Sequence, residues 1–282
     1  MEYKFSVLMS VYYKENCNFL KKSLDSIIEV QDEKPSEIVL IKDGKLGKEL
    51  DDTIEQYKIK YPNLFKIISL EKNEGLGKAL NIGLKNCKYD LVARMDADDI
   101  SKKNRFKKQL EIFKKNKDID IVGSWVQEFE EEKGTIFLKR ERRVPEKSDE
   151  IYSKLKKICV FNHPTVMYKK SKVVQVGSYL QEFLLEDYYL WVRLAISGAK
   201  MYNIQESLVL FRITSDTPKR RGGIRLLKSD IKFQKKLYEL KFLTFQEQIL
   251  NVVTYGLYRI IPSRIRGFLQ RRFLRTNSKR GK

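Results

Sequence analysis

Short apolar runs alternate with helical repeats along the first 126 residues of the chain. The runs with the length and composition of buried strands are Phe5–Val11, Glu37–Lys42, Phe65–Leu70 and Leu91–Met95. Between the first two runs, apolar residues from Phe19 to Ile28 recur at the spacing of a helix. Because strands that alternate with helices form βαβ crossovers, this pattern predicts an α/β fold with a mostly parallel, doubly wound sheet.

The pattern becomes mixed in the second half of the chain. The elements predicted after Trp125 are a hairpin around Glu130–Gly134, a helix over Glu186–Ser197, and strands near Met201 and over Ser207–Arg212. Residues 216–225 are polar and basic and contain a Gly-Gly pair, which is typical of a mobile loop. We therefore predict one domain over residues 1–215, with halves 1–126 and 127–215, and a helical tail over residues 216–282.

Three segments with polar side chains follow predicted strands directly. They are Ser10–Tyr13, Asp43 and Asp96–Asp99. Ligands of doubly wound sheets bind beyond the carboxyl ends of the strands. We therefore expect these segments, which are far apart in the sequence, to lie along one rim of the sheet.

The positive charge of the chain is concentrated towards residue 282. The net charge is +20, and residues 219–282 hold 18 Lys and Arg against three acidic residues. Such a segment predicts an anionic partner, either nucleic acid or an anionic lipid surface. The preceding residues are nearly balanced in charge, so their chemistry need not involve nucleic acid.

The cysteine, histidine and apolar content excludes several classes of protein. With three Cys, no Cys-x-x-Cys pair and one His, a zinc site made of Cys and His is not expected. An odd, sparse set of thiols suits a reducing cytoplasm. We find no secretory signal pattern and no apolar stretch approaching the ~20 residues that cross a bilayer. The expected protein is cytoplasmic, and it is soluble or lies on a membrane.

Three carboxylates crowd the end of the fourth predicted strand. Asp96, Asp98 and Asp99 repel one another unless a cation or hydrogen bonds compensate. Mg²⁺ binds one or two carboxylates and completes its shell with water and substrate phosphates. The alternative is an acidic helix cap before Lys103–Lys115, with Asp99 as the capping residue. Both interpretations stay open on the sequence alone.

A second acidic pair, Glu186 and Asp187, opens a helix of mixed aromatic and apolar sequence. Acidic residues in a first turn are favoured by the helix dipole. The functional alternative is a general base beside a sugar-binding surface, because aromatic faces such as those of Tyr188 and Trp191 stack on pyranose rings. Trp191 fits the hydrophobic core equally well.

Two further residues have suitable chemistry but no complete motif. Lys78 follows Gly75-Leu-Gly77, which is only loosely similar to a phosphate-binding loop and lacks the P-loop spacing. His163 precedes Pro164 and is more typical of a structural histidine than of a ligand.

The motifs occur together in the order found in family-2 glycosyltransferases, which have the GT-A fold. The segments that carry this resemblance are Ser6–Tyr12, Glu37–Gly44, Asn73–Gly83, Ala93–Asp99 with Arg105 and Gln109, and Glu186–Trp191. The resemblance covers about residues 5–212. The subgroup to which the chain is most similar is the capsular and exopolysaccharide transferases.

The resemblance implies a nucleotide-sugar donor, which we expect to be a UDP-sugar, and Mg²⁺ or Mn²⁺ as cofactor. The predicted donor-binding residues are Ser10, Val11, Tyr12, Asp43, Lys78, Asp96 and Arg212. In this scheme Asp43 contacts the nucleobase. Asp98 and Asp96 are the predicted metal-binding residues: Asp98 binds the metal, and Asp96 faces the ribose or metal-bound water. Arg212 lies near the diphosphate or the acceptor.

On the acceptor side, the resemblance implies that Asp187 is the base, with Glu186, Tyr188 and Trp191 beside it. Two departures from the family pattern are visible. The second strand ends in Lys42-Asp43-Gly44, where many relatives have two Asp followed by Gly-Ser. Arg212-Ile-Thr214 lacks the histidine often found two residues after that arginine, and His163 is a candidate to compensate.

The chemistry of glycosyl transfer fits these residues. The leaving diphosphate needs a cation to stabilise its charge, and the acceptor hydroxyl needs a base to take its proton. The acceptor half offers one candidate base and no second acid pair. This favours a single displacement with inversion, as the resemblance also implies.

The end of the chain shows the pattern of a helix that lies in a membrane interface. The residues near one helical face are Ile261, Ile265, Phe268, Leu269 and Phe273, with Arg264, Arg266, Arg271 and Arg275 largely off it. The alternative is a face packed on the domain. We expect peripheral binding to the inner face of the plasma membrane, and a saccharide acceptor that is lipid-linked.

Two other functions stay open. A sugar nucleotidyltransferase shares sugar-nucleotide chemistry and acidic metal sites, and pyrophosphate release would identify it. A nucleic-acid-binding protein would use the basic tail, and it would bind DNA or RNA more strongly than anionic vesicles in a salt-dependent way. We expect no nucleic acid partner.

Overall fold

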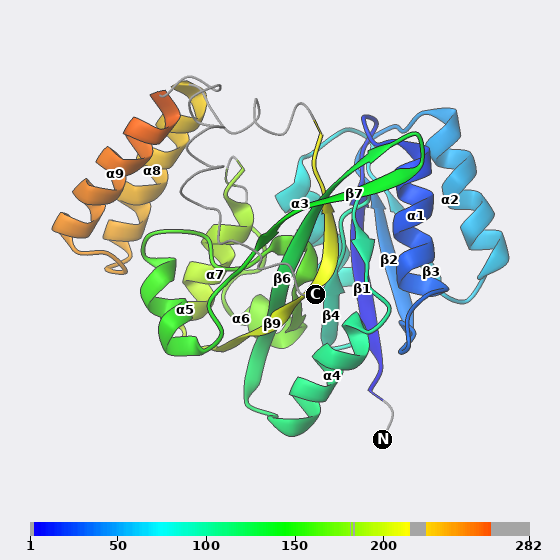
Figure 1. Cartoon of the computed structure of the whole chain (residues 1–282), viewed down its shortest axis with the longest axis horizontal. Helices are drawn as coiled ribbons and strands as arrows, with labels where there is room; N and C mark the ends of the chain where they lie inside the picture. Colours follow the sequence, from blue (N-terminus) through cyan, green and yellow to red (C-terminus); the bar gives the residue numbers. More distant parts are fainter. Residues whose placement is uncertain (1–2, 181, 183, 215–223, 261–282) are drawn as a thin grey trace, which may run out of the picture. The chain divides into compact units, whose positions relative to one another are not determined.

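The computed structural model describes residues 3–180, 182, 184–214 and 224–260 (Figure 1). The chain divides into two compact units between Arg212 and Ile213. The loop predicted for residues 216–225 lies outside the described residues apart from its last two, which begin a helix. The amphipathic helix predicted after residue 260 lies wholly outside them.

The N-terminal half of the first unit alternates strands with helices. Its elements are β1 (Phe5–Val11), α1 (Cys17–Ile28), β2 (Glu37–Lys42), α2 (Lys48–Lys60), β3 (Phe65–Ser69), α3 (Leu76–Asn86) and β4 (Leu91–Arg94). These strands pair in the order β3-β2-β1-β4, and all three pairings are parallel. The four strands predicted from the apolar runs are therefore confirmed, with bounds within one residue.

The second half completes a nine-stranded sheet within the described residues. Its elements are β5 (Ile100–Ser101), α4 (Arg105–Lys115), β6 (Ile119–Glu132), β7 (Thr135–Arg142), α5 (Ser148–Leu155), η1 (His163–Thr165), β8 (Met167–Lys169), α6 (Lys170–Gln175), α7 (Glu186–Ile196) and β9 (Lys200–Arg212). β8 is antiparallel to both β4 and β6, whereas β6 and β9 are parallel. The predicted hairpin is β6–β7, and the two strands predicted near Met201 and over Ser207–Arg212 form one strand, β9.

The central strands are apolar along their whole length because both faces of the sheet are covered. On β1, Val7, Met9 and Val11 belong to a core cluster with residues of α1, α2 and α4. Leu8 points to the other face, where it meets α3. This two-sided burial fixes the strands whose carboxyl ends carry the acidic residues.

Gly83 lets α3 pack closely against β1 and β2. A Cβ atom at this position would lie 2.4 Å from Cδ1 of Leu8 and 3.0 Å from Cγ1 of Ile41. Alanine is favoured over glycine inside a helix by ~1 kcal/mol, but overpacking costs about 1–3 kcal/mol. We expect Gly83→Ala to lower the free energy of unfolding by about 1 kcal/mol in urea denaturation.

The control for this prediction is Gly83→Ala in a Leu8→Val background, which lacks the clashing Cδ1 atom. There the substitution should cost less than it does in the wild type. An equal loss of stability in both backgrounds would contradict the packing explanation.

The second unit is a pair of helices, α8 (Ile224–Glu239) and α9 (Phe245–Ile260). Thr244 and Glu247 form a reciprocal capping pair at the start of α9, in which each backbone N–H donates to the other residue's side chain. Arg259 and Asp230 join the two helices by an ion pair of 2.7 Å. In the described parts of the chain, no helix is long and apolar enough to cross a membrane.

Candidate active site

The acidic cluster lies directly after β4, at its carboxyl end. Asp96, Asp98 and Asp99 each offer a carboxylate oxygen, and these oxygens all lie within 4.8 Å of one another. Asp96 and Asp98 are partly exposed, whereas Asp99 is fully buried. The cluster therefore has three members, one more than the two metal-binding residues predicted from the sequence.

Burial and mutual repulsion make these carboxylates difficult to ionise together. Burial, reinforced by the charge of Asp96, raises the pKa of Asp98 to about 6. Burial and the charges of Asp98 and Asp96 hold the pKa of Asp99 well above its usual value. Oδ1 of Asp99 accepts from the backbone N–H of Arg212 at 2.8 Å, and Oδ2 is buried without a partner. A divalent cation would supply the missing positive charge.

The helix-cap interpretation of Asp99 is wrong. Helix α4 begins at Arg105, with Asn104 at its cap position. Between Asp99 and this helix lies β5, which pairs with β9. Because the chain forms β5 before α4 begins, the carboxylate of Asp99 does not cap the helix. It lies in the acidic cluster and accepts a hydrogen bond from Arg212 at the end of β9.

Arg94 connects the acidic cluster electrostatically with the first turn of α7. Its guanidinium is buried and forms an ion pair with Asp96. Its Nε and Nη1 atoms are buried without a partner. The positive charge of Arg94 also opposes the rise in the pKa of Glu186 and Asp187. The two acidic groups, about 90 residues apart in sequence, therefore experience the same buried charge.

The acidic pair of α7 has two different environments. Glu186 is buried, its Oε2 has no partner, and burial raises its pKa to about 7. Asp187 is partly exposed, and burial of its carboxyl also raises its pKa. Its carboxylate accepts from the backbone N–H of Tyr188 at 2.7 Å and from the thiol of Cys159 at 3.8 Å. Of the two residues, Asp187 is the more exposed one, although its carboxyl is itself buried.

The proposed sugar-stacking role of Tyr188 and Trp191 is wrong. Trp191 is fully buried, 5.4 Å from the ring of Phe161 and 6.0 Å from that of His163. Tyr188 is 3% exposed, and its hydroxyl donates to the carbonyl of Leu155. Both aromatic rings belong to the core. For Trp191, the core alternative left open by the sequence is the one observed.

Asp43 holds the loop that precedes α3. Its two carboxylate oxygens accept from the backbone N–H groups of Glu74 (2.7 Å) and Gly75 (3.1 Å). Gly75 adopts a φ of +88°, which favours glycine. Two residues later, a Cβ atom on Gly77 would lie 3.3 Å from Cβ of Glu186. These contacts bring the end of β2, the start of α3 and the start of α7 together.

The other residues predicted on the donor side differ in exposure. Ser10 and Tyr12 are partly exposed, whereas Val11 is fully buried at the end of β1. Lys78 is exposed and pairs with Glu74 at 2.8 Å. The contacts of these residues and of Asp43 with a donor stay predictions.

Arg212 joins the end of β9 to the acidic cluster. Its Nε donates to the carbonyl of Asp98 at 2.8 Å, and its Nη1 donates to Glu131 at 2.8 Å. Its guanidinium lies over the rings of Phe19 and Phe129, at 3.7 and 4.5 Å from their centres. Sequence reasoning missed Glu131, whose only local signal is its place in an acidic run before the hairpin turn.

The described contacts of His163 are those of a structural residue. Its Nε2 lies 3.1 Å from the hydroxyl of Tyr179. Burial, with a contribution from the charge of Arg94, holds the pKa of His163 well below its usual value, so the ring is neutral near pH 7. This agrees with the structural role that the sequence favoured.

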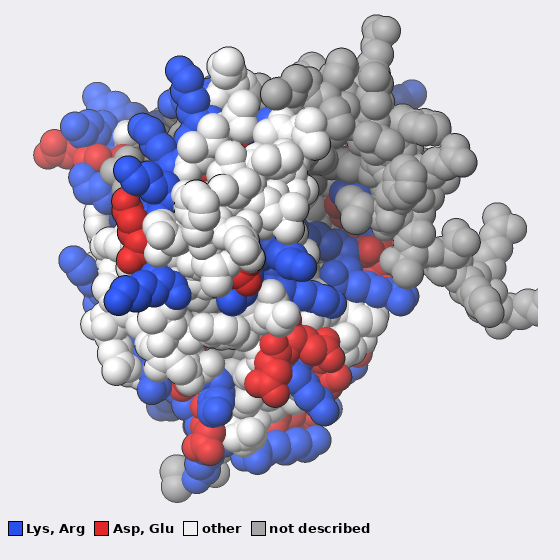
Figure 2. Space-filling model, turned by 90° about the vertical axis from the view of Figure 1, so that its left-hand side faces the viewer, with Lys and Arg blue, Asp and Glu red and all other residues white. Residues whose placement is uncertain are grey.

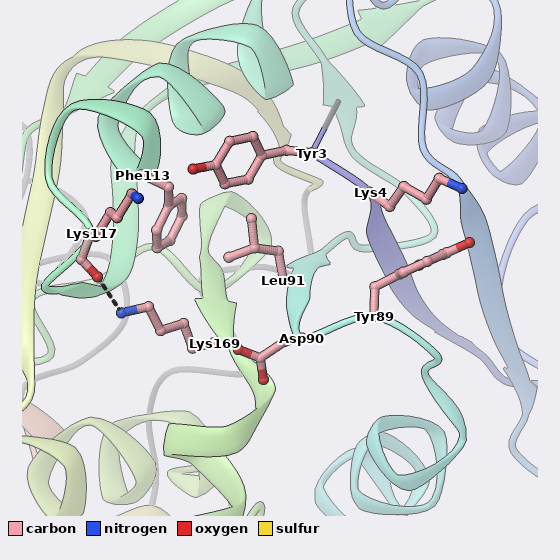
Figure 3. A pocket seen from close by; sticks show the side chains of 8 residues that line it. All are labelled: Tyr3, Lys4, Tyr89, Asp90, Leu91, Phe113, Lys117 and Lys169. Carbon is pink, nitrogen blue, oxygen red and sulfur yellow. Dashed lines mark hydrogen bonds between the residues drawn. The ribbon is translucent and has the colours of Figure 1, made fainter. Parts of the chain in front are cut away.

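A cavity of about 370 Å³ lies at the other end of the sheet (Figure 3). It is formed where β1 and β4 begin, and its lining includes Tyr3, Tyr89, Phe113 and Lys169. The acidic cluster follows the carboxyl end of β4. The cavity is therefore separate from the predicted donor site.

Comparison with known proteins identifies the family. A model of the family described as Glycosyl transferase family 2 matches residues 6–177. The chain belongs to this glycosyltransferase family. The predicted resemblance is thereby confirmed.

Relatives of this glycosyltransferase match nearly its whole length. UDP-Gal:alpha-D-GlcNAc-diphosphoundecaprenol beta-1,3-galactosyltransferase of Escherichia coli is 41% identical over 276 residues, which cover 96% of this chain and 97% of the relative. Amylovoran biosynthesis glycosyltransferase AmsE of Erwinia amylovora is 34% identical over 265 residues, covering 94% and 97%. Both names belong to enzymes that build polysaccharides or their lipid-linked precursors.

Solved structures confirm the GT-A fold of the glycosyltransferase. S. aureus TarS 1–349 in complex with UDP-GlcNAc has a TM-score of 0.64 at 18% identity, covering 98% of this chain and 76% of that one. Mannosyltransferase PcManGT from Pyrobaculum calidifontis, in complex with GDP-Man and Mn²⁺, has a TM-score of 0.62 at 13% identity, covering 92% and 70%.

The buried Glu186 of this glycosyltransferase should make its stability depend on pH. Glu186 has a pKa of about 7 in the folded protein, above the ~4.3 of an exposed glutamate. The folded state therefore favours the protonated form of Glu186. Its contribution to the free energy of unfolding is lost as the pH rises towards 7. We therefore expect the melting temperature of Glu186→Gln to rise relative to that of the wild type as the pH is raised from 5 to 8. A difference that stays constant across this range would contradict the prediction.

Proposed function

We propose that this glycosyltransferase moves a hexose from a UDP-sugar to a lipid-linked saccharide, with inversion at the anomeric carbon. The observation that carries the proposal is that the buried charge of Arg94 pairs with one acidic group and acts electrostatically on a second. One is the cluster of Asp96, Asp98 and Asp99, and the other is the partly exposed Asp187. Glycosyl transfer needs a site that stabilises the charge of the leaving diphosphate and a base that takes the proton of the acceptor hydroxyl.

The chemistry of the acidic cluster fits a divalent cation. Three carboxylates lie within 4.8 Å, and Oδ2 of Asp99 is buried without a partner. Asp98 and Asp96, which are partly exposed, would hold Mg²⁺ or Mn²⁺ together with the phosphates of the donor. When bound, the cation supplies Lewis-acid stabilisation of the charge on the leaving diphosphate.

Arg212 and Arg94 keep the cluster in place. Arg212 donates from its backbone N–H to the carboxylate of Asp99 and from its Nε to the backbone carbonyl of Asp98, each at 2.8 Å. Arg94 orients Asp96 by a buried ion pair. Both guanidiniums retain a buried N–H group without a partner, so each is suited to donate to a phosphate oxygen of the donor.

Asp187 is the proposed base. Its Oδ1 is held by the backbone N–H of Tyr188, which orients the carboxylate at the start of α7. The proton of the acceptor hydroxyl passes to this carboxylate as the oxygen bonds to the anomeric carbon and the diphosphate leaves. One base acting in one displacement gives the product with inverted configuration. The side chain of the neighbouring Glu186 packs against Gly77.

The nature of donor and acceptor is inferred from the E. coli relative. That enzyme's name specifies UDP-Gal as donor and alpha-D-GlcNAc-diphosphoundecaprenol as acceptor, and 96% of this chain aligns with it at 41% identity. We infer a UDP-hexose donor and an acceptor sugar linked to a polyprenyl diphosphate. Such an acceptor is held in a bilayer, and we propose that the enzyme acts at the inner face of the plasma membrane.

The test is a donor and acceptor panel with the full chain. UDP-galactose, UDP-glucose, UDP-GlcNAc and GDP-mannose are each offered with a synthetic GlcNAc-diphosphate lipid, with Mn²⁺ or with a chelator. We expect a disaccharide product from a UDP-sugar and only with the cation. Product formed in excess chelator, or from GDP-mannose alone, would contradict the proposal. Pyrophosphate release from UTP and a sugar 1-phosphate, without sugar transfer from any nucleotide sugar, would instead identify a nucleotidyltransferase.

A further inference from the structure

Helix α9 carries a row of apolar side chains on its exposed side. The exposed fractions are 61% for Phe245, 47% for Ile249, 60% for Leu250, 53% for Val253 and 63% for Leu257. At the period of an α-helix, these positions fall within an arc of about 140°. They form one continuous surface, which we call the α9 face.

The side of α9 that meets α8 is partly polar. Asn251 is buried and donates to Oε1 of Gln234 at 2.9 Å. Arg259 pairs with the buried Asp230. A helix pair surrounded by water places apolar residues inside and polar residues outside. α9 has polar groups inside and a row of apolar ones outside, so its outer face favours an apolar medium.

The net charge of the second unit indicates which apolar surroundings the α9 face would meet. The basic residues of its described part are Arg225, Lys228, Lys232, Lys235, Lys236, Lys241 and Arg259. They outnumber the acidic residues Asp230, Glu239 and Glu247. Figure 2 shows one face of the molecule, on which an uncharged area is bordered by Lys and Arg side chains. A second copy of the chain would bring the same positive charges together, whereas an anionic lipid surface complements them.

We propose that the α9 face inserts into an anionic bilayer, with the basic residues of α8 at the lipid headgroups. An apolar helix face in a basic unit that does not span the membrane is the pattern of interfacial binding, and here the lysines are on the neighbouring helix α8. The anchor would thus begin at Phe245, well before the amphipathic segment after residue 260 that the sequence indicated. The biological purpose rests on the proposed lipid-linked acceptor, but the binding itself requires no substrate.

The test compares one double variant and one single variant of the full chain with the wild type on vesicles. Leu250→Gln with Leu257→Gln shortens the apolar face without changing its charge. On vesicles of phosphatidylcholine and phosphatidylglycerol, we expect at least about tenfold weaker partition than for the wild type. The matched control is Ile59→Gln on α2, which is 71% exposed in the first unit and should bind as the wild type does. Pure phosphatidylcholine should bind the wild type more weakly.

Three results would overturn the proposal. Unchanged vesicle binding by the double variant would place the anchor elsewhere. A wild type that is dimeric without lipid, and a double variant that is monomeric, would make the α9 face a self-association surface. A large fall in the melting temperature of the double variant without lipid would mean that the face packs on the protein itself.

A short-chain, water-soluble acceptor separates this proposal from the proposed function. The double variant should transfer sugar to it as fast as the wild type, since no bilayer is involved. If the wild type itself fails to use such acceptors or any UDP-sugar, the proposed function is wrong, and the vesicle result still decides the α9 face.

Discussion

Asp98→Ala should abolish sugar transfer together with its dependence on Mg²⁺ or Mn²⁺. Loss of a Lewis acid removes several kcal/mol of transition-state stabilisation, which corresponds to roughly a thousandfold or more in rate. The variant should still fold, because it loses one of three carboxylates that repel one another in a partly buried cluster. Single-turnover transfer and melting temperature, each with and without Mn²⁺, measure the two effects.

A readout independent of activity comes from ligand stabilisation. Mn²⁺ with UDP should raise the melting temperature of the wild type and leave that of Asp98→Ala unchanged. The matched control is Asp118→Ala, since Asp118 is an exposed aspartate just before β6. It should keep both transfer and stabilisation. Full activity of the wild type in excess chelator would remove the metal from the proposed mechanism.

Asp187→Asn should slow sugar transfer at least about a hundredfold while the protein folds and binds donor normally. Loss of a general base costs about 10² to 10⁴ in rate, because an amide cannot take the proton of the acceptor hydroxyl. Stability should fall by no more than about 1 kcal/mol if only the interaction with the helix dipole is lost. Single-turnover transfer, donor affinity and melting temperature together separate catalysis from structure.

Glu186→Gln is the internal control for this substitution. Glu186 occupies the preceding position on α7 but is buried against Gly77, with little access to an acceptor. Its replacement should slow transfer less than Asp187→Asn does. Near-normal transfer by Asp187→Asn would return that residue to a role in the helix start, and a larger defect in Glu186→Gln would make Glu186 the better candidate for the base.

Local patterns determined the strands and the positions of the acids. Residues 5–11, 37–42 and 91–94 could be recognised as strands because a strand buried on both faces must be apolar throughout. The cluster after β4 and the acidic pair of α7 were visible for a related reason: polar residues directly after such strands, or in a first helical turn, stand out from their surroundings. The family motifs also lie within short segments, so their order sufficed to identify the family.

The partners of those residues depended on contacts between distant segments. Nothing near Asp99 in the sequence indicates that β5 lies between this residue and α4. Nor does it indicate that the backbone N–H of Arg212 donates to the carboxylate of Asp99. Glu131 reaches Arg212 only because the long strands β6 and β9 run side by side. Arg94 became central because burial removes water from its charge, and burial is a property of the packed fold.

Amphipathic residues were the least predictable for the same reason. The aromatic sequence of α7 suits a sugar platform or a core equally well, and only packing against Phe161 and Leu155 assigns Trp191 and Tyr188 to the core. Conversely, the apolar residues of α9 could have faced inwards. Their exposure follows from Asn251 and Arg259, whose hydrogen bonds to α8 turn the polar side of the helix inwards. The sequence alone determined which residues could do chemistry, and the tertiary structure decided which polar and apolar side chains face outwards, because the direction of a side chain depends on what packs beside it.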